Sequence, residues 1–335
     1  MIRVLLYGLG PIGVMVAKQL AVRDGFRIVA AVDIDPAKVG RDVAEVAGLP
    51  RPIRVKVDPD ARHALRKSKP DVAVLCTSST VRGVMPQIEM ILKSRVPIVT
   101  TTEELSYPVR RNIPLARRID TMAKRAKAAV LSTGVNPGFV MDALPIMLTV
   151  ACERIESISV SRVQDARSRR LPFQQKIGVG LSSEQFRREV ERESIRHVGL
   201  SESISMIADA VGWQLDHITD DVRPRMADAT VASEFLAVDP GYVCGIIQDA
   251  VGYRHGTPVI TMHMEAYLGA PASYDEVLID GSPRIHSRID GGIHGDLATA
   301  SLAVNAIPAV IAAEPGLRTM RDVRLPSFYG GAAKR

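Results

Sequence analysis

A glycine turn close to the start of the chain constrains the fold more than any other feature. The apolar run Ile2–Tyr7 leads into Gly8-Leu9-Gly10-Pro11-Ile12-Gly13, and a helical pattern follows from Val14 to Ala21. A strand, a G-x-G-x-x-G turn and a helix in this order predict a dinucleotide-binding motif. A glycine turn in any other α/β protein is the alternative, and the flanking strand and helix favour nucleotide binding.

Each position of this turn has an expected task. Gly8 permits the tight turn, Gly10 lets the backbone approach a pyrophosphate, and Gly13 lets the helix pack closely on the strand. Pro11 and Ile12, between Gly10 and Gly13, are expected to contact the cofactor as well. The N–H groups that a helix start leaves unpaired then face the phosphates.

A second apolar run, Arg27–Val32, ends at an acid that bears on the choice of cofactor. Asp33 lies twenty residues after Gly13, where this fold places the carboxylate that binds a ribose 2′-OH. Asp35 follows, and a carboxylate here favours NAD over NADP because it repels a 2′-phosphate. Asp35 could instead cap a helix that starts near Pro36. Arg41 could still reach a 2′-phosphate, so both cofactors stay open.

Strands and helices alternate through the first part of the chain, which predicts a doubly wound parallel sheet of the Rossmann type within an α/β protein. The next expected strands are Asp71–Cys76, Val96–Thr100 and Ala129–Ser132, with helices over Gly83–Ser94 and Pro114–Ala128. Polar residues follow the strand ends and are expected to line the cofactor crevice: Thr77, Ser78, Ser79, Thr102 and Asn136.

The turn-rich loop Thr133–Phe139 is expected to cross between two domains, and the pattern changes from Ile155. We therefore expect a nucleotide-binding domain over 1–135 and a substrate and dimerisation domain over 136–296. The second domain is expected to be α+β with a mostly antiparallel sheet. Its expected strands are Ile155–Arg162, Thr230–Val238, Gly241–Tyr253, Pro258–Leu268, Glu276–Ile279 and Arg284–Ile289, and its helices are Val140–Leu148, Ser183–Ile195 and Ser203–Trp213. An apolar helix, Leu297–Ala313 with Asp296 as its cap, could return to pack on the first domain.

Two glutamates are the only ionisable side chains expected deep in the crevice that can do acid–base work. Glu103 and Glu104 follow Thr101 and Thr102, which come after the strand that ends at Thr100. A carboxylate beside a nicotinamide can stabilise a cation, orient an amine or activate water. It is poorly suited to polarise a carbonyl for hydride attack, so it indicates amine or imine chemistry. The structural alternative is a favourable interaction of either glutamate with a helix dipole.

Further candidates lie in the second domain. A strand that ends in arginines could bind a substrate carboxylate in a bidentate manner, with Arg162 or Arg169 as the candidates and Gln164 beside them. His197 lies in an expected loop and His263 in an alternating strand. A lone histidine is more often structural than catalytic.

Bulk properties exclude several classes of protein. The net charge is +6 and aromatic residues make up 4% of the chain, and no basic stretch is interleaved with aromatics, so nucleic-acid binding is not expected. The three cysteines are far apart, which indicates a reducing, cytoplasmic compartment and no metal site. We expect no signal peptide and no membrane span. No H-E-x-x-H, paired-cysteine or G-x-S-x-G motif occurs.

Six segments together resemble those of one protein family. They are YGLGPIG from Tyr7, DIDPAKVGRD from Asp33, TTTEELSYP from Thr100, TGVNPGFVMD from Thr133, RHVGLSES from Arg196 and GGIHGDLATA from Gly291. With them the chain resembles the dihydrodipicolinate reductase-like superfamily, and within it the 2,4-diaminopentanoate dehydrogenases and the related NAD(P)-dependent amine dehydrogenases. The TTTEEL and GVNPGFVMD segments are the most specific.

The resemblance implies reversible oxidative deamination of an amine to a ketone and ammonium, with reductive amination as the reverse reaction. It implies that a glutamate of TTTEEL is catalytic, and we favour Glu103 over Glu104 because it comes directly off the strand end. It also implies a homodimer built through the sheet of the second domain.

The substrate stays open at this point. A diamino acid would need an arginine for its carboxylate, whereas a simple amine would need an apolar pocket, for which Phe139, Met141 and Phe173 are the candidates. The paired-histidine and D-A-P-S-G-T segments of dihydrodipicolinate reductases are absent from the sequence. A dihydrodipicolinate reductase- or homoserine dehydrogenase-type oxidoreductase and a non-catalytic NAD(P)-binding sensor are the alternatives.

Overall fold

The computed structural model describes residues 1–331, and the chain divides into two compact units. One unit comprises Met1–Phe139 together with the chain from His294 onward, and the other comprises Val140–Ile293. The boundaries expected from the sequence, at residues 135 and 296, lie close to these. The first unit is therefore built from two separate stretches of chain, and the second is continuous.

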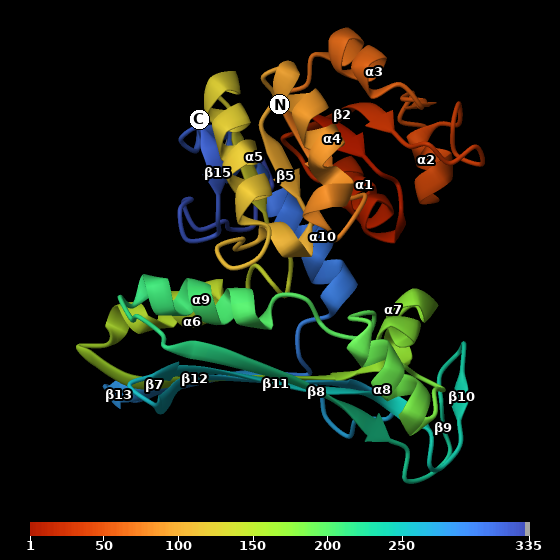
Figure 1. Ribbon diagram of the computed structural model, residues 1–335. Coiled ribbons are helices and arrows are strands. Elements are labelled where there is room, and N and C mark those ends of the chain that lie inside the picture. Colours follow the sequence, from red (N-terminus) through yellow and green to blue (C-terminus); the bar gives the residue numbers. More distant parts are fainter. Residues whose placement is uncertain (332–335) are drawn as a thin grey trace. The chain divides into compact units, whose positions relative to one another are not determined.

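A seven-stranded sheet forms the centre of the first unit, in the order β15-β6-β5-β4-β1-β2-β3, and all of its strand pairs are parallel (Figure 1). The strands are β1 (Ile2–Tyr7), β2 (Phe26–Val32), β3 (Val57–Asp58), β4 (Val72–Leu75), β5 (Ile98–Thr100), β6 (Ala129–Ser132) and β15 (Gly316–Arg318). β4, β5 and β6 are buried along their whole length, which is why their sequences read as continuous apolar runs.

Helices connect these strands and bury their apolar faces against the sheet. They are α1 (Pro11–Val22), α2 (Val43–Ala47), α3 (Ala61–Ser68), α4 (Val81–Lys93), the short 3-10 helix η1 (Glu103–Leu105), α5 (Ile113–Ala126), α10 (Gly295–Asn305) and α11 (Ile307–Ala312). Leu65, Ile88 and Ile119 from three of the helices share one buried cluster with Leu5 and Leu75 of the sheet. The expected doubly wound parallel sheet is confirmed.

The apolar helix near the C-terminus differs from its expected form in two respects. It is split into α10 and α11, because Pro308 lies in the first turn of α11 and has no N–H to donate to the preceding turn. His294 rather than Asp296 is the N-cap residue, and its side chain accepts from Leu297 N. Gln19 of α1 donates to Ser301 of α10 at 2.9 Å, so the helix belongs to the first unit.

The same stretch has the length and composition of a membrane span, contrary to the expectation from the sequence. Gly295–Ala312 covers 18 residues with a mean hydropathy of 1.4. Its buried side chains include Val304, Ile307 and Val310, each 0% exposed. This burial explains the apolar composition as that of core helices.

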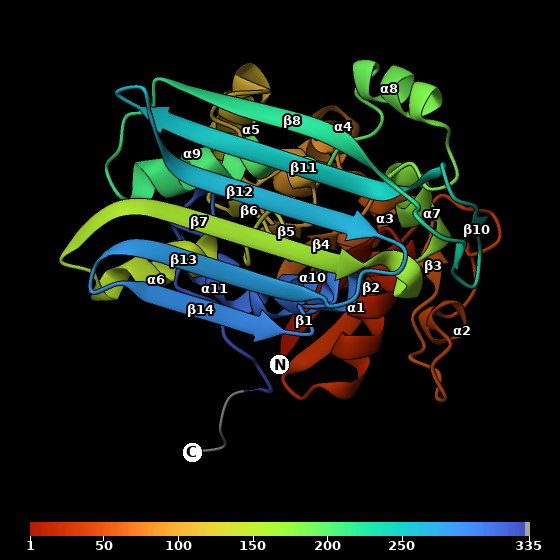
Figure 2. The ribbon, with the colours of Figure 1, turned by 90° about the horizontal axis from the view of Figure 1, so that it is seen from below.

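A six-stranded mixed sheet forms the second unit, in the order β14-β13-β7-β12-β11-β8, and Figure 2 shows these strands side by side. Its strands are β7 (Arg154–Asp165), β8 (His217–Met226), β11 (Val243–Arg254), β12 (Thr257–Tyr267), β13 (Tyr274–Ser282) and β14 (Ile285–Asp290). β7 and β12 are parallel and the other neighbours are antiparallel. The remaining elements are α6 (Ala143–Leu148), η2 (Thr149–Ala151), η3 (Ala166–Ser168), α7 (Leu171–Lys176), α8 (Ser183–Glu191), α9 (Leu200–Ala210), β9 (Val231–Ala232) and β10 (Ala237–Val238).

Two strand assignments in this unit differ from the sequence analysis. Strand β8 was not expected, because its sequence HITDDVRPRM is rich in charge and contains Pro224. It lies at the sheet edge, where a proline is tolerated. The expected strand Thr230–Val238 is instead the small hairpin of β9 and β10.

Candidate active site

The glycine turn has the geometry that a bound dinucleotide requires. Gly8 has φ +92°, and a Cβ on Gly13 would lie 1.9 Å from the carbonyl oxygen of Gly8. A Cβ on Gly10 would meet no atom within 4 Å, so the backbone there is open to a ligand. Gly10 is the N-cap of α1 and Pro11 is in its first turn. The first amides of a helix lack intrahelical partners, so those of Ile12 and Gly13 are available to phosphate oxygens.

Asp33 lies at the end of β2 and is tied to this turn. Its Oδ2 accepts from Leu9 N at 2.7 Å, and its Oδ1 accepts from Asp35 N at 2.9 Å. These two bonds fix the carboxylate beside the glycine turn. An ionised carboxylate has lone pairs left for a ribose hydroxyl, so the residue fits the expected contact.

The segment after β2 differs from the expectation. Asp35 accepts from Ala37 N at 3.0 Å, but it closes a turn and caps no helix, since α2 begins at Val43 with Asp42 as its N-cap. Pro36 opens that turn rather than a helix. Arg41, the expected partner for a 2′-phosphate, is exposed, pairs with Glu45 of α2 and donates to Ala37 O.

The ends of β4 and β5 contribute the other expected cofactor contacts. Thr77 lies against the turn, since a Cβ on Gly8 would come within 2.7 Å of its Cγ2. Ser78 bonds to Thr80 at the start of α4. Thr102 is buried and shares a hydrogen bond of 2.8 Å with Thr100.

Two more of the expected residues follow these strands. The carbonyl oxygen of Ser79 accepts from Glu104 N at 3.1 Å. Asn136 is buried, and its peptide bond to Pro137 is cis. The parallel order β6-β5-β4-β1-β2 puts all of these strand ends at one edge of the sheet.

The two glutamates of the TTTEEL segment have different surroundings. The carboxylate of Glu104 accepts from Val81 N at 2.9 Å and from Asn112 Nδ2 at 3.1 Å. Glu104 therefore caps the first turn of α4, which is the structural role considered for it. Glu103 begins η1 directly after Thr102 and is partly exposed.

In the second unit, Arg162 is not available to a substrate carboxylate. It is buried, its Nη1 pairs with Asp275, and its Nη2 donates to Ile293 O at 2.7 Å. Asp275 accepts from Ile293 N at 2.7 Å. Gln164 donates to the same carbonyl oxygen and accepts from Arg169 at 3.0 Å. Arg162 and Gln164 thus hold the chain just before His294.

His263 is separated from the other candidates by the sheet itself. On β12 it pairs with Asp249 at 2.6 Å and with Glu265 at 2.9 Å. Its neighbour Met262 is buried, and a Cβ on Gly252 of the adjacent strand would touch Ile204 of α9. Since successive residues of a strand face opposite sides, His263 faces away from α9. His263 thus lies on the opposite face of the sheet from Arg162 and Gln164, and its contact with substrate stays a prediction.

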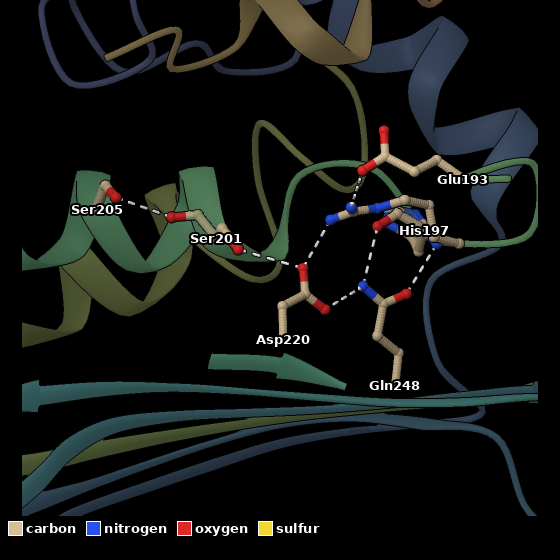
Figure 3. Close-up of polar contacts among 7 residues, drawn as sticks. Glu193, His197, Ser201, Ser205, Asp220 and Gln248 are labelled. Atoms are coloured by element: carbon tan, nitrogen blue, oxygen red, sulfur yellow. Dashed lines mark hydrogen bonds and ion pairs between the residues drawn. The ribbon is translucent and has the colours of Figure 1, made fainter. Parts of the chain in front are cut away.

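His197 lies in a loop that the sheet holds by its backbone (Figure 3). Gln248, which is 0% exposed, accepts from His197 N at 2.8 Å and donates to His197 O at 3.1 Å. Its amide also donates to Asp220 at 2.7 Å, and Asp220 accepts from Arg196 at 2.8 Å. Burial, followed by the positive charges of Lys176, Arg162 and Arg169, holds the pKa of His197 well below its usual value, so its imidazole is neutral.

The three candidates for an apolar pocket differ in exposure. Met141 is 0% exposed, so its side chain is part of the packed interior. Phe173 is partly exposed and lies 3.9 Å beneath the guanidinium of Arg169. Phe139 is partly exposed.

Several residues of these arrangements were not expected from the sequence. Lys38 pairs with both acids after β2, Asn112 binds Glu104, and Gln248 with Asp220 holds the His197 loop. The lysine in DIDPAK was the one available signal. Within residues 1–331, no group of three or more His, Cys, Asp or Glu side chains could hold a metal ion.

Comparisons with known proteins show which family models and relatives the chain matches. Residues 139–335 match the family model of the 2,4-diaminopentanoate dehydrogenase C-terminal domain, and residues 2–116 match that of the dihydrodipicolinate reductase N-terminus. The chain is 32% identical to 2,4-diaminopentanoate dehydrogenase of Acetoanaerobium sticklandii, over 98% of this chain and 95% of that one. It is 26% identical to an amine dehydrogenase of Streptomyces virginiae, over 100% and 99% of the two chains.

A solved structure agrees with these relatives. Amine dehydrogenase from Mycobacterium smegmatis matches with a TM-score of 0.88 and 26% identity, over 99% of this chain and 98% of that one. At this coverage the match extends over both units. The chain belongs to the 2,4-diaminopentanoate dehydrogenase family.

Proposed function

We propose that this chain is an NAD(P)-dependent amine dehydrogenase. A protonated amine or diamino acid, NAD(P)+ and water would give a ketone, ammonium, NAD(P)H and a proton, and reductive amination is the reverse. The relatives named above act on amines by their names. The observation that carries the proposal is an acid, Glu103, three residues beyond the end of β5 at the edge where the glycine turn lies.

The two glutamates have different proposed roles. The carboxylate of Glu104 binds Val81 N at the start of α4 and Asn112, so its role is structural. Glu103, the first residue after Thr102 beyond the end of β5, is the proposed catalytic residue. In deamination its carboxylate would stabilise the substrate iminium and take a proton from the attacking water. In the reverse direction it would hold ammonia. The bound nicotinamide would accept or donate the hydride.

Several finer points belong to the same proposal. Gly8 to Gly13, Asp33, Thr77, Ser78, Ser79, Thr102 and Asn136 would hold the cofactor, with NAD favoured by Asp33. Phe139, Gln164, Phe173 and His197 would contact the substrate. We expect a homodimer in the cytoplasm, in keeping with three free cysteines.

The test compares Glu103→Gln with Glu104→Gln. Turnover is followed as NAD(P)H absorbance across a panel of short amines and diamino acids. We expect Glu103→Gln to lower kcat at least about a hundredfold, because general acid–base groups contribute factors of that size, with NAD affinity unchanged. Glu104→Gln keeps an acceptor for Val81 N and is expected to keep most activity. Full activity of both variants would overturn the mechanism.

A further inference from the structure

The turn after β2 carries a lysine, Lys38, to which no role in cofactor binding has been assigned so far. Lys38 Nζ lies 3.0 Å from Asp35 Oδ2 and 3.6 Å from Asp33 Oδ2. Its side chain is 26% exposed, against 11% for Asp33 and 41% for Asp35. One ammonium thus serves two carboxylates and remains in contact with solvent.

The position of this ammonium follows from Asp33. Both oxygens of that carboxylate accept backbone amides, from Leu9 and from Asp35, so its orientation is fixed. In this fold the acid at the end of the second strand binds the ribose 2′-OH. Because Lys38 Nζ is within ion-pair distance of the same carboxylate, it lies beside the place of the ribose 2′ position.

The charges at this place decide which cofactor is tolerated. Two carboxylates alone would repel a 2′-phosphate, and Lys38 offsets them. Partial burial acts to lower the pKa of Lys38, but the hydrogen bond and charge of Asp35, with the charge of Asp33, raise it above its usual value. The hydrogen bond from Lys38, then that from Ala37, lowers the pKa of Asp35. Lys38 and Asp35 are therefore both charged at neutral pH.

We propose that Lys38 is the residue that admits NADP: it pairs with Asp35 when the ribose carries a hydroxyl and turns to the phosphate when the ribose carries a 2′-phosphate. Lysine suits this because its charge sits on a flexible four-carbon stem. Arg41, the other cation of the segment, is already paired with Glu45 and bonded to Ala37 O. The chain accordingly uses both cofactors, which refines the proposed function at its nucleotide site.

Direct binding tests the assignment without any amine. NADH and NADPH are titrated into the full-length protein and followed by nucleotide fluorescence and by calorimetry. We expect Lys38→Ala to raise the Kd for NADPH at least about tenfold, since a charge-assisted contact to phosphate is lost, and to change that for NADH less than about threefold. Asp35→Asn removes the ion pair with Lys38 and one negative charge, so we expect it to lower the Kd for NADPH more than the Kd for NADH.

Matched variants separate this role from a general effect of charge. Lys38→Arg keeps the positive charge and should retain NADPH binding. Lys93, an exposed lysine paired with Glu89 on α4, serves as the control, and Lys93→Ala should change neither affinity. Melting curves confirm that each variant is folded.

Three results would overturn the assignment. The first is that Lys38→Ala weakens the binding of NADH and NADPH equally. The second is that Arg41→Ala weakens NADPH binding while Lys38→Ala does not. The third is that the wild-type protein does not bind NADPH. The binding measurements contain no amine, so they do not depend on whether the protein turns over an amine. The proposed amine dehydrogenase activity and the proposed role of Lys38 can therefore fail independently of one another.

Discussion

Two histidines of the second unit have pKa values shifted in opposite directions. His197 is kept neutral by burial and by the positive charges around it, which lower its pKa. Partial burial acts to lower the pKa of His263 as well, but its hydrogen bonds to Asp249 and Glu265 raise it. Both residues were candidates for substrate contact from the sequence. The groups that shift their pKa values include Arg162 for His197 and Asp249 for His263, which are far from them in the sequence.

The two shifts predict opposite dependences of stability on pH. The folded chain resists protonation of His197, so stability should fall as the pH drops below about 6.5, the value in an unfolded chain. The charged form of His263 is favoured on folding, so its contribution is present below about pH 6.5 and is lost as the pH rises through the raised pKa.

Urea unfolding of single variants at several pH values tests this prediction. His197→Gln should lose less stability than wild type on acidification from about pH 7.5 to about pH 5.5. His263→Gln should be destabilised most at about pH 6 and little at high pH. Parallel pH profiles of both variants and wild type would contradict the assignment.

At the scale of elements, the loop before α9 is held to β11 by a single buried amide. Gln248 binds His197 N, His197 O and Asp220 (Figure 3). We predict that Gln248→Leu lowers the free energy of unfolding by about 3 kcal/mol, because it leaves several buried polar groups without partners. Gln175→Leu, at an exposed glutamine of α7, should change it by less than about 0.5 kcal/mol. Equal effects of the two variants in urea unfolding would refute this role.

The sequence predicted elements well where local pattern determines them. Strands β1, β4 and β6 are buried apolar runs, and the glycine turn precedes α1 as expected. Local pattern was insufficient for β8, whose charged, proline-containing sequence pairs only because it lies at an edge. The break between α10 and α11 was not predicted from the sequence either.

For the candidate site, the sequence predicted the positions of residues at strand ends but not their side-chain partners. Residues at strand ends follow from topology, so the positions of Asp33, Thr77 and Glu103 could be anticipated. Side-chain partners from distant segments could not. The pairing of Arg162 with Asp275 and the capping of α4 by Glu104 join residues far apart in the sequence, and no periodicity in the chain encodes them.

At the scale of the whole molecule, we predict that the proposed homodimer forms through the sheet face of the second unit that points away from α9. Ser159 and Thr261 share a hydrogen bond of 2.7 Å on that face, on the paired strands β7 and β12. We predict that Thr261→Arg converts a dimer into monomers, because a buried unpaired charge is costly at an interface. Sedimentation of Thr121→Arg, at an exposed threonine of α5, provides the control. An unchanged mass for Thr261→Arg would exclude this face.

The discontinuous build of the first unit has a consequence for synthesis of the chain on the ribosome. Strand β15 pairs with β6 and α10 packs on α1, yet the whole second unit is translated between these partners. The nascent chain therefore completes the second unit first, although domains commonly finish in order from the N-terminus. Until β15 emerges, the edge of β6 is an unpaired strand, and such edges attract other chains. The nucleotide-binding unit starts first and is the last to be finished.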